Sequence, residues 1–411
     1  MIIEVIAVGT ELLLGQIVNG NAAFIGSALA ENGFDAHYQQ VVGDNLGRVA
    51  DAIGLALSRA DAVIITGGLG PTRDDLTREA ICAATGREMR HSDTYEEALR
   101  ERFARLGREI PASNFRQADY PDGAEMLPNP KGTAPGLALE HAGKWIFAIP
   151  GVPEEMEHLL VEEVLPRLRR AAGLEGALVN RVLRTWGRPE SWVGERLDDL
   201  FESSNPSIAF LASGGEIKVR ITAKAASEAE ALAAIAPMEE EVRRRLGPAV
   251  FAVDSETIES VLFALLEEKG WTIGSAESMT AGLVAARLTA LPGASKYFRG
   301  GIVAYVDDLK RDLLGVDVSH GVVNERVAVE MARGARSRLA VDVAIAVTGS
   351  AGPEPMEQPA GTVVIGVATP EDAAARTLTF AGDRERVRTY STTAALQLAR
   401  LAMTGAWWRR G

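Results

Sequence analysis

The sequence predicts an α/β protein of three domains, and three patterns support this. Residues 1–172 alternate apolar runs with helical patterns, the spacing of a doubly wound parallel sheet. Residues 173–250 change to a period of two around one charged helix, which is typical of a small α+β domain. The α/β alternation returns over residues 251–411. At roughly 100–200 residues per domain, the 411 residues accommodate three such units.

The first domain is predicted from short apolar runs that end at a glycine or a polar residue. We expect strands over 2–8, 62–65 and 145–149, and a further strand ending at 41–42. Helices are expected over 21–32, 45–60, 77–85 and 153–170. Ligands of such sheets bind outside the carboxyl ends of the strands, so the loops after these runs are the places to search for function.

The other two domains follow from the same periodicities. The middle domain should hold strands near 180–185 and 216–223 and a helix over 228–246, and no catalytic cluster, which suits a spacer or dimerisation module. The C-terminal domain should hold an apolar helical stripe over 258–266. Its further strands are expected at 272–274, 301–306, 343–347, 363–367 and 377–380, and its further helices at 281–290, 307–314 and 384–403.

Composition excludes several classes of function. The chain has a formal net charge of -13 and no basic tract, whereas a general nucleic-acid binder needs a basic surface. Cys82 is the single cysteine, so no intramolecular disulfide forms, as suits a reducing compartment. The first apolar run lacks a basic leader and contains Glu4, which indicates a strand and not a signal peptide. We therefore expect a cytoplasmic protein with no membrane segment and no direct nucleic-acid partner.

The glycine-rich stretch 66–77 is the most informative N-terminal motif. It follows a buried strand and opens a helix, and its glycines would let the backbone approach a phosphate beside free helix N–H groups. Asp74 and Asp75 could bind a divalent cation that bridges phosphate oxygens. A plain glycine turn with an acidic helix cap explains the spacing equally well.

The turn at 276–282 carries the C-terminal candidate nucleophile, Ser278, between a strand and a helix whose N–H groups could hold an oxyanion. A serine needs a base, and no histidine is well placed. A lysine can serve where its surroundings disfavour the charged form, and Lys310 is the candidate, with Tyr305 nearby in sequence. The small-residue loop 348–353 ends another strand. The plainer interpretation makes Ser278 a helix cap, Tyr305 a core residue and Lys310 a solvated one.

Taken together, these motifs are similar nearly end to end to the competence/damage-inducible CinA family. The matching segments are Gly9 to Gly15, 66–77, 149–156, Ala276 to Thr280, Tyr305 with Lys310 to Val316, and 348–353 with Gly361 to Val363. The resemblance implies a molybdopterin-binding-like N-terminal domain that hydrolyses ADP-ribose to AMP and ribose 5-phosphate. That activity would use a divalent metal (magnesium, manganese or cobalt) with potassium. It also implies a C-terminal amidase domain that deamidates nicotinamide mononucleotide without a cofactor.

The resemblance also assigns residues. The catalytic residues would be Ser278, Tyr305 and Lys310, with the C-terminal substrate held by Glu277, Thr280, Gly282, Thr348, Gly349, Ser350, Ala351 and Gly352. The N-terminal substrate would be held by Gly9, Glu11, Asn19, Gly67, Gly68, Gly70, Pro71, Thr72, Thr77, Pro150 and Gly151. Candidate metal ligands are Asp44, Asp74, Asp75 and Glu154, with Glu11 as an alternative. Three features depart from the family pattern: Met279 stands where many members have Cys, Ala281 where many have Gly, and the loop 354–358 lacks the family's usual glycines.

Two further expectations complete the prediction. A neutral lysine would be opposed by nearby carboxylates, so we expect Glu277, Asp307 and Asp308 to point away from Lys310, with the two aspartates favouring the helix N-terminus. We also expect a homodimer. The alternative to an enzyme is a non-catalytic nucleotide- or pterin-binding protein that acts through partners in competence or the DNA-damage response.

Overall fold

The computed structural model describes residues 1–174, 176–213, 215–355 and 357–407. The chain forms two compact units. The first comprises Met1–Val179 with Lys224–Ala231, and the second Asn180–Ala223 with Leu232–Gly411. Among the described helices, none has the length and apolar composition that crossing a membrane would require.

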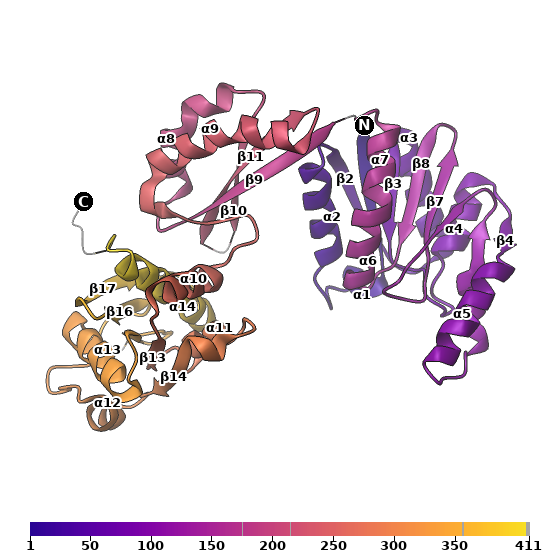
Figure 1. The fold of residues 1–411 in the computed structure, drawn as a ribbon. Helices are drawn as coiled ribbons and strands as arrows, with labels where there is room; N and C mark the ends of the chain where they lie inside the picture. The colour runs from indigo at the N-terminus through magenta and orange to yellow at the C-terminus, as the bar shows by residue number, and fades with distance from the viewer. Residues whose placement is uncertain (175, 214, 356, 408–411) are drawn as a thin grey trace. The chain divides into compact units, whose positions relative to one another are not determined.

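A six-stranded sheet forms the centre of the N-terminal unit, in the order β2-β1-β3-β8-β7-β6 (Figure 1). The first four are parallel, as expected, and the last two are antiparallel. The sequence pattern did not predict β7 and β6. The strand bounds are β1 Ile2–Val8, β2 Asp35–Val42, β3 Ala62–Thr66, β6 Glu125–Leu127, β7 Gly136–His141 and β8 Lys144–Ile149, and β4 Met89–His91 pairs separately with β5 Asp119–Pro121.

Helices cover both faces of this sheet. Ile25, Leu29 and Met156 belong to a core on one face, and Val49 and Ile53 belong to a core on the other. Each buried stripe recurs every three or four residues, which is why these segments are helical. The helices are α1 Thr10–Leu13, α2 Gly20–Glu31, α3 Leu46–Arg59, α4 Thr77–Thr85, α5 Asp93–Arg105, α6 Pro153–Leu159 and α7 Leu165–Ala171, with a π-helical turn at Leu160–Val164 and a 3-10 helix at Ala112–Ala118.

The middle segment forms a four-stranded sheet in the order β10-β11-β9-β12. Alternate residues of β11, among them Val219 and Ile221, are buried, which matches the predicted period of two. The elements are β9 Ala177–Trp186, α8 Glu190–Leu197, β10 Ser207–Ser213, β11 Glu216–Ala225, α9 Glu228–Leu246 and β12 Val250–Val253. The helix α9 has the predicted bounds.

The C-terminal segment contains a five-stranded sheet in the order β14-β13-β15-β16-β17. Strands β14, β13 and β15 are parallel, whereas β16 and β17 are antiparallel. The elements are α10 Ile258–Lys269, β13 Ile273–Glu277, α11 Leu283–Leu288, β14 Phe298–Val303, α12 Asp307–Leu314, α13 Glu325–Leu339, β15 Val343–Gly349, β16 Thr362–Ala368, β17 Ala373–Thr379 and α14 Arg384–Met403. The strand predicted at 301–306 begins and ends three residues earlier.

Candidate functional sites

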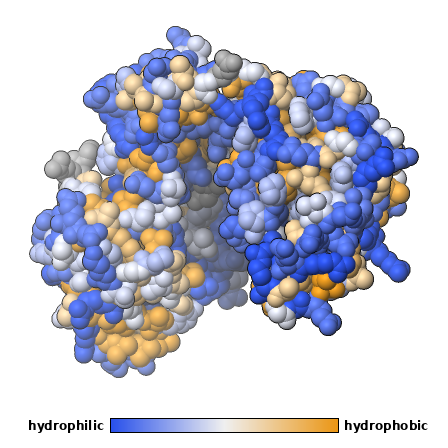
Figure 2. Space-filling model, turned by 45° about the vertical axis from the view of Figure 1, so that its right-hand side comes forward, coloured by the Kyte–Doolittle hydropathy of each residue, from blue (hydrophilic) through white to orange (hydrophobic). Residues whose placement is uncertain are grey.

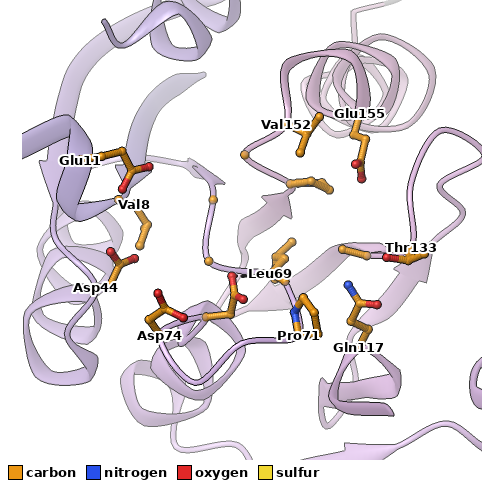
Figure 3. Close-up of a pocket in the computed structure, with 18 residues that line it drawn as sticks. Val8, Glu11, Asp44, Leu69, Pro71, Asp74, Gln117, Thr133, Val152 and Glu155 are labelled. Atoms are coloured by element: carbon orange, nitrogen blue, oxygen red, sulfur yellow. Dashed lines mark hydrogen bonds between the residues drawn. The ribbon is translucent and has the colours of Figure 1, made fainter. Parts of the chain in front are cut away.

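Loops at the carboxyl ends of the parallel strands enclose a cavity of about 420 Å³ in the N-terminal unit (Figure 3). The predicted residues that line it are Gly9, Glu11, Asp44, Gly67, Gly68, Gly70, Pro71, Asp74, Asp75, Pro150 and Gly151. The other lining residues were not predicted as ligands, although three of them lie within the matching segments 66–77 and 149–156: they are Val8, Leu69, Gln117, Thr133, Ala134, Val152 and Glu155.

The glycine loop of this cavity has a backbone that other residues would strain. Gly67 and Gly68 have φ angles of 100° and 67°, and a Cβ at either would clash with Val8 or with Thr77. The Thr77 hydroxyl donates to the Gly67 carbonyl oxygen at 2.8 Å. The N–H groups of Gly67 and Gly70 are already used by protein acceptors. Within the described residues, the N–H groups of Gly68 and Leu69 have no acceptor, so these two can bind a phosphate.

The Asp75 carboxylate holds the second half of the loop. Its Oδ1 accepts from the Gly70 N–H at 2.8 Å, and its Oδ2 accepts from the Thr72 N–H at 2.8 Å and the Thr72 hydroxyl at 2.6 Å. Beneath the loop, the buried Arg78 donates to the Leu69 carbonyl oxygen at 2.7 Å, and burial lowers the pKa of its guanidinium. Both carboxylate oxygens of Asp75 thus accept hydrogen bonds from the loop, so its main role in the structure is to hold the loop in shape.

The charged side chains that line the cavity are all acidic. Five carboxylates line it, and its wall contains no lysine or arginine. Figure 3 shows Glu11, Asp44 and Asp74 on one side, with Glu155 on another part of the wall. The pKa of Asp74 lies below its usual value, chiefly through the Thr72 hydroxyl and then through its own backbone N–H. Because that hydroxyl has one hydrogen, and its 2.6 Å contact is with Asp75, the two carboxylates compete for it.

A divalent cation fits this donor set in one particular way. Among the described residues, no three His, Cys, Asp or Glu side chains are grouped so that they could hold a metal ion. Magnesium, however, is commonly held by one or two carboxylates with water and substrate phosphate supplying the other ligands. The exposed Asp74 is suited to this role, whereas the Asp44 carboxylate already accepts from the Thr10 N–H at 2.8 Å.

Some predicted N-terminal residues lie outside the cavity wall. The Glu154 carboxylate pairs with Lys131 at 3.0 Å, and the neighbouring Glu155 lines the cavity instead. The two differ by one position on α6, and a motif at a helix start does not distinguish which of two neighbouring side chains faces inward. Thr72 and Thr77 support the loop, and Asn19 caps α2 beside a second, smaller cavity.

The C-terminal candidate residues lie at the carboxyl ends of the parallel strands β13, β14 and β15. The Ser278 N–H donates to the Val347 carbonyl oxygen at 2.9 Å, and the Ala304 N–H donates to the Glu277 carbonyl oxygen at 2.8 Å. The loops after β13, β14 and β15 therefore start side by side. This arrangement brings Ser278, Tyr305 and the 348–352 loop to the same end of the sheet, because those three strands are parallel.

The turn at Ser278 differs from the expected helix-start oxyanion site. The Glu277 side chain is buried and accepts from the N–H groups of Gly282, Val284 and Ala285 at 2.9–3.0 Å. The carboxylate therefore occupies the start of α11 and supports the turn. This structural role differs from the substrate-binding role that the resemblance predicted for Glu277.

Two N–H groups of the same turn remain available. Within the described residues, the Met279 and Thr280 N–H groups have no acceptor, and they follow the candidate nucleophile directly. Ala281, where the family favours glycine, has a φ of 50°, a left-handed conformation that costs a non-glycine residue energy. The tight turn thus places two adjacent donors next to Ser278.

Lys310 is buried, with 2% of its surface exposed, and its ammonium has two partners. Its Nζ lies 3.2 Å from the Tyr305 carbonyl oxygen and 3.1 Å from Asp307 Oδ1. The prediction that Asp307 points away was therefore wrong: from the first turn of α12, its carboxylate reaches the residue three positions later. Asp308 accepts from the Leu309 N–H, and Glu277 is bound at α11, as expected for these two.

Two arginines on α14 that the motifs missed support this edge. Arg384 donates to the Tyr305 hydroxyl at 2.8 Å and to the Gly352 carbonyl oxygen at 3.0 Å. Arg388 donates to the carbonyl oxygens of Met279 and Thr280 at 2.9 and 3.0 Å. Their spacing of four places both on one helix face, a signal that the sequence contains but that does not indicate what the face contacts.

Buried hydroxyls complete the C-terminal site. Thr348 donates to the Val322 carbonyl oxygen at 2.9 Å and so anchors its loop. In the part of the chain that the structure describes, the buried hydroxyl oxygens of Thr280 and Ser350 have no hydrogen-bond partner. Unpartnered buried polar groups are uncommon in proteins and often mark functional positions.

The fold and sites define a multidomain α/β protein, and comparison with known proteins places it more closely. Residues 4–170 match a family described as a probable molybdopterin binding domain, 180–252 the damage-inducible protein CinA KH domain, and 255–403 the CinA C-terminal domain. A CinA-like protein of Frankia casuarinae is 48% identical, covering 98% of this chain and 96% of its own. One of Gloeobacter violaceus is 44% identical, covering 97% and 95%.

The chain therefore belongs to the CinA family. Among solved structures, a CinA protein of unknown function from Thermoplasma acidophilum is 38% identical. It covers 40% of this chain and 97% of its own, with a TM-score of 0.37.

Proposed function

We propose that the C-terminal domain is an amidohydrolase that converts nicotinamide mononucleotide to nicotinate mononucleotide and ammonia. The observation that supports it best is that Ser278, Tyr305 and the buried Lys310 converge at the carboxyl ends of the parallel strands. The family resemblance supplies the substrate. No metal or other cofactor takes part in the proposed chemistry, and the cytoplasm is its proposed location.

The proposed reaction has two steps. Ser278 Oγ attacks the carboxamide carbon as its proton passes to the neutral amine of Lys310. The N–H groups of Met279 and Thr280 stabilise the oxyanion. The carbon–nitrogen bond then breaks, and Lys310 returns the proton to the leaving ammonia. Water hydrolyses the acyl-serine, which releases nicotinate mononucleotide and restores the hydroxyl.

Two neighbours adjust this chemistry. Tyr305 is half exposed and its hydroxyl accepts from Arg384, so it is placed to assist proton transfer at the mouth of the site. The Asp307 carboxylate holds Lys310 Nζ at 3.1 Å, so the proposed proton transfer requires this contact to open.

For the N-terminal domain, we propose metal-dependent hydrolysis of ADP-ribose to AMP and ribose 5-phosphate, with potassium as a further ion. The acidic cavity favours this second activity, because an anionic diphosphate would be repelled by its carboxylates unless a cation were bound with it. The N–H groups of Gly68 and Leu69 would hold a phosphate oxygen, and Asp75 would keep the loop in shape. Asp74, with Asp44 or Glu11, would hold the divalent ion, which when bound supplies Lewis-acid chemistry.

Two crossed variants test both assignments. Ser278→Ala should abolish ammonia release from nicotinamide mononucleotide and leave ADP-ribose hydrolysis at the wild-type rate. Gly67→Ala should do the reverse, because the added Cβ would clash with the Val8 carbonyl oxygen. Near-normal ammonia release by Ser278→Ala would remove it as nucleophile. Saturable binding of both nucleotides without turnover by the wild type would favour the non-catalytic alternative.

A further inference from the structure

A third cavity in the N-terminal unit shares no lining residue with the other two. It lies between α5, the loop after β6 and the start of the segment that follows α6, and it measures about 550 Å³. That volume exceeds that of the acidic cavity and is typical of sites for small organic molecules. Figure 2 shows apolar residues within the mainly hydrophilic surface at the lower end of this unit, the end at which α5 lies in Figure 1. The apolar part of the cavity wall consists of Tyr95, Ala98, Leu99, Pro128 and Pro130.

The charged groups of this cavity are mainly basic, unlike those of the acidic cavity. Arg102 and Arg105 both line it, and their spacing of three places them on one face of α5. In the part of the chain that the structure describes, neither guanidinium forms an ion pair. Of the two glutamates in the wall, Glu163 pairs with Arg167, which leaves Glu162 as the opposing charge. Two arginines without carboxylate partners beside an apolar wall favour an anionic ligand.

Arg102 also holds the loop that separates this cavity from the acidic one. We call residues 128–134 the dividing loop. Arg102 donates to three of its carbonyl oxygens, those of Asn129, Pro130 and Gly132. The far end of the dividing loop, at Thr133 and Ala134, lines the acidic cavity. The two cavities therefore lie on either side of one loop, and one arginine binds that loop from the basic side.

The dividing loop has further contacts that reach the acidic cavity. The Asn129 amide donates to Glu155 Oε2 at 2.6 Å, and Glu155 lines the acidic cavity. The Tyr95 hydroxyl donates to the Thr133 carbonyl oxygen at 3.2 Å, and burial raises the pKa of this phenol to about 12, so it stays a donor. The loop also packs tightly, because a Cβ at Gly132 would clash with the Glu155 carboxylate. A movement of the loop thus displaces groups of the acidic cavity.

We propose that the third cavity binds a small aromatic carboxylate, and that its occupation loosens the dividing loop. The carboxylate accepts from Arg102 and Arg105, whose planar guanidinium groups match its two oxygens. Arg102 gains more from this charged acceptor than from the neutral carbonyl oxygens that it now contacts, so it releases the loop. The ring covers Leu99 and the prolines. A phosphate fits less well, because it has no apolar face and because its second negative charge meets Glu162. The inference does not rest on either proposed activity.

The binding test uses benzoate as the probe and calorimetry on the full-length protein. The wild type should bind benzoate saturably, and Arg105→Ala should weaken this binding at least about tenfold, as expected when a hydrogen bond between charged groups is lost. Arg105 is exposed and does not hold the loop, so this variant should fold. The control is Arg108→Ala, which removes the same charge from an exposed residue outside the cavity and should leave the affinity unchanged. Benzamide, which has the same shape without the charge, should bind at least about tenfold more weakly.

The loop test follows hydrogen–deuterium exchange in the same samples. The N–H groups of Lys131 and Gly132 donate to the Asn129 side chain, so their exchange reports the state of the dividing loop. Saturating benzoate should speed this exchange severalfold in the wild type and leave it unchanged in Arg105→Ala at the same concentration.

Several results would overturn the proposal. Absent binding, or equal affinity in wild type and Arg105→Ala, would place no carboxylate in this cavity. Equal weakening by Arg108→Ala would reduce the effect to overall charge. Benzamide binding as tightly as benzoate would make the site merely apolar, and inorganic phosphate binding as tightly would make it a general anion site. Unchanged or slower exchange of the loop with benzoate bound would contradict the loosening.

Discussion

The N-terminal and C-terminal sites occupy the same place on two α/β sheets and differ in nearly everything else. The first is a cavity lined by carboxylates, where a bound anion needs a cation. The second lies at the carboxyl ends of three parallel strands and brings together the hydroxyl of Ser278, our candidate nucleophile, and the buried amine of Lys310. In both, parallel strands bring separate loops together, and the side chains of those loops decide the chemistry. This difference is the reason why we propose two independent reactions in one chain.

The largest effect should come from Lys310. Both Lys310→Arg and Lys310→Met should lose about 10²–10⁴-fold in ammonia release, because a guanidinium cannot act as a base and a thioether has no proton to exchange. ADP-ribose hydrolysis should persist in both, and circular dichroism should confirm folding. If Lys310→Arg stays within a few-fold of wild type, Lys310 is only an electrostatic anchor, and Tyr305 becomes the candidate base.

Asp75 provides the corresponding change at the other site. Asp75→Ala removes the acceptor of three loop hydrogen bonds, which should lower the free energy of unfolding by about 1–3 kcal/mol. A displaced phosphate loop should reduce ADP-ribose hydrolysis about 100-fold. Ammonia release should not change. Asp51→Ala, an exposed position on α3, is the control, and wild-type ADP-ribose turnover by Asp75→Ala would contradict a loop-shaping role.

A smaller effect is expected at Asp307, where the prediction from sequence was wrong. Asp307→Asn removes the carboxylate that pairs with Lys310 Nζ at 3.1 Å and that would have to release it for the proposed proton transfer. Ammonia release at pH 7 should rise about threefold, in keeping with the 0.2–1 kcal/mol typical of partly solvated ion pairs. Asp308→Asn serves as the control, because Asp308 contacts its own helix start. A fall in activity with Asp307→Asn would mean that Asp307 positions the lysine for catalysis.

The smallest effect concerns pH and the N-terminal unit alone. Asp119 and then Glu96 raise the pKa of His91, through contacts of 2.6 and 3.0 Å. A raised pKa in the folded state stabilises the protein below the unfolded value of about 6.5, and this contribution is lost as pH rises through the folded value. In thermal unfolding, the free energy of unfolding of the wild type should exceed that of His91→Asn by about 1 kcal/mol or less at pH 5.5. The two values should converge by pH 8.5. A difference that grows with pH would contradict the assignment.

Sequence periodicity predicted the long elements well because their stripes of buried residues are regular. The helices 228–246, 307–314 and 384–403 have their predicted bounds. Short antiparallel strands such as β6, and β14 with its two glycines, lack such a stripe and were missed or displaced. Motifs located the glycine loop and Ser278. They could not show that Glu277 would bind the start of α11, or that Arg384 and Arg388 would reach across from a distant helix, since those contacts depend on tertiary packing.

The central claim is that one chain holds a metal-dependent and a metal-independent hydrolase. Its most direct test is to measure both reactions on the same wild-type sample before and after chelation with EDTA. ADP-ribose hydrolysis should fall at least about tenfold and return with added magnesium, because the carboxylate-lined cavity cannot otherwise hold a diphosphate. Ammonia release from nicotinamide mononucleotide should be unchanged. Loss of both activities, or undiminished ADP-ribose hydrolysis in the chelator, would contradict the account.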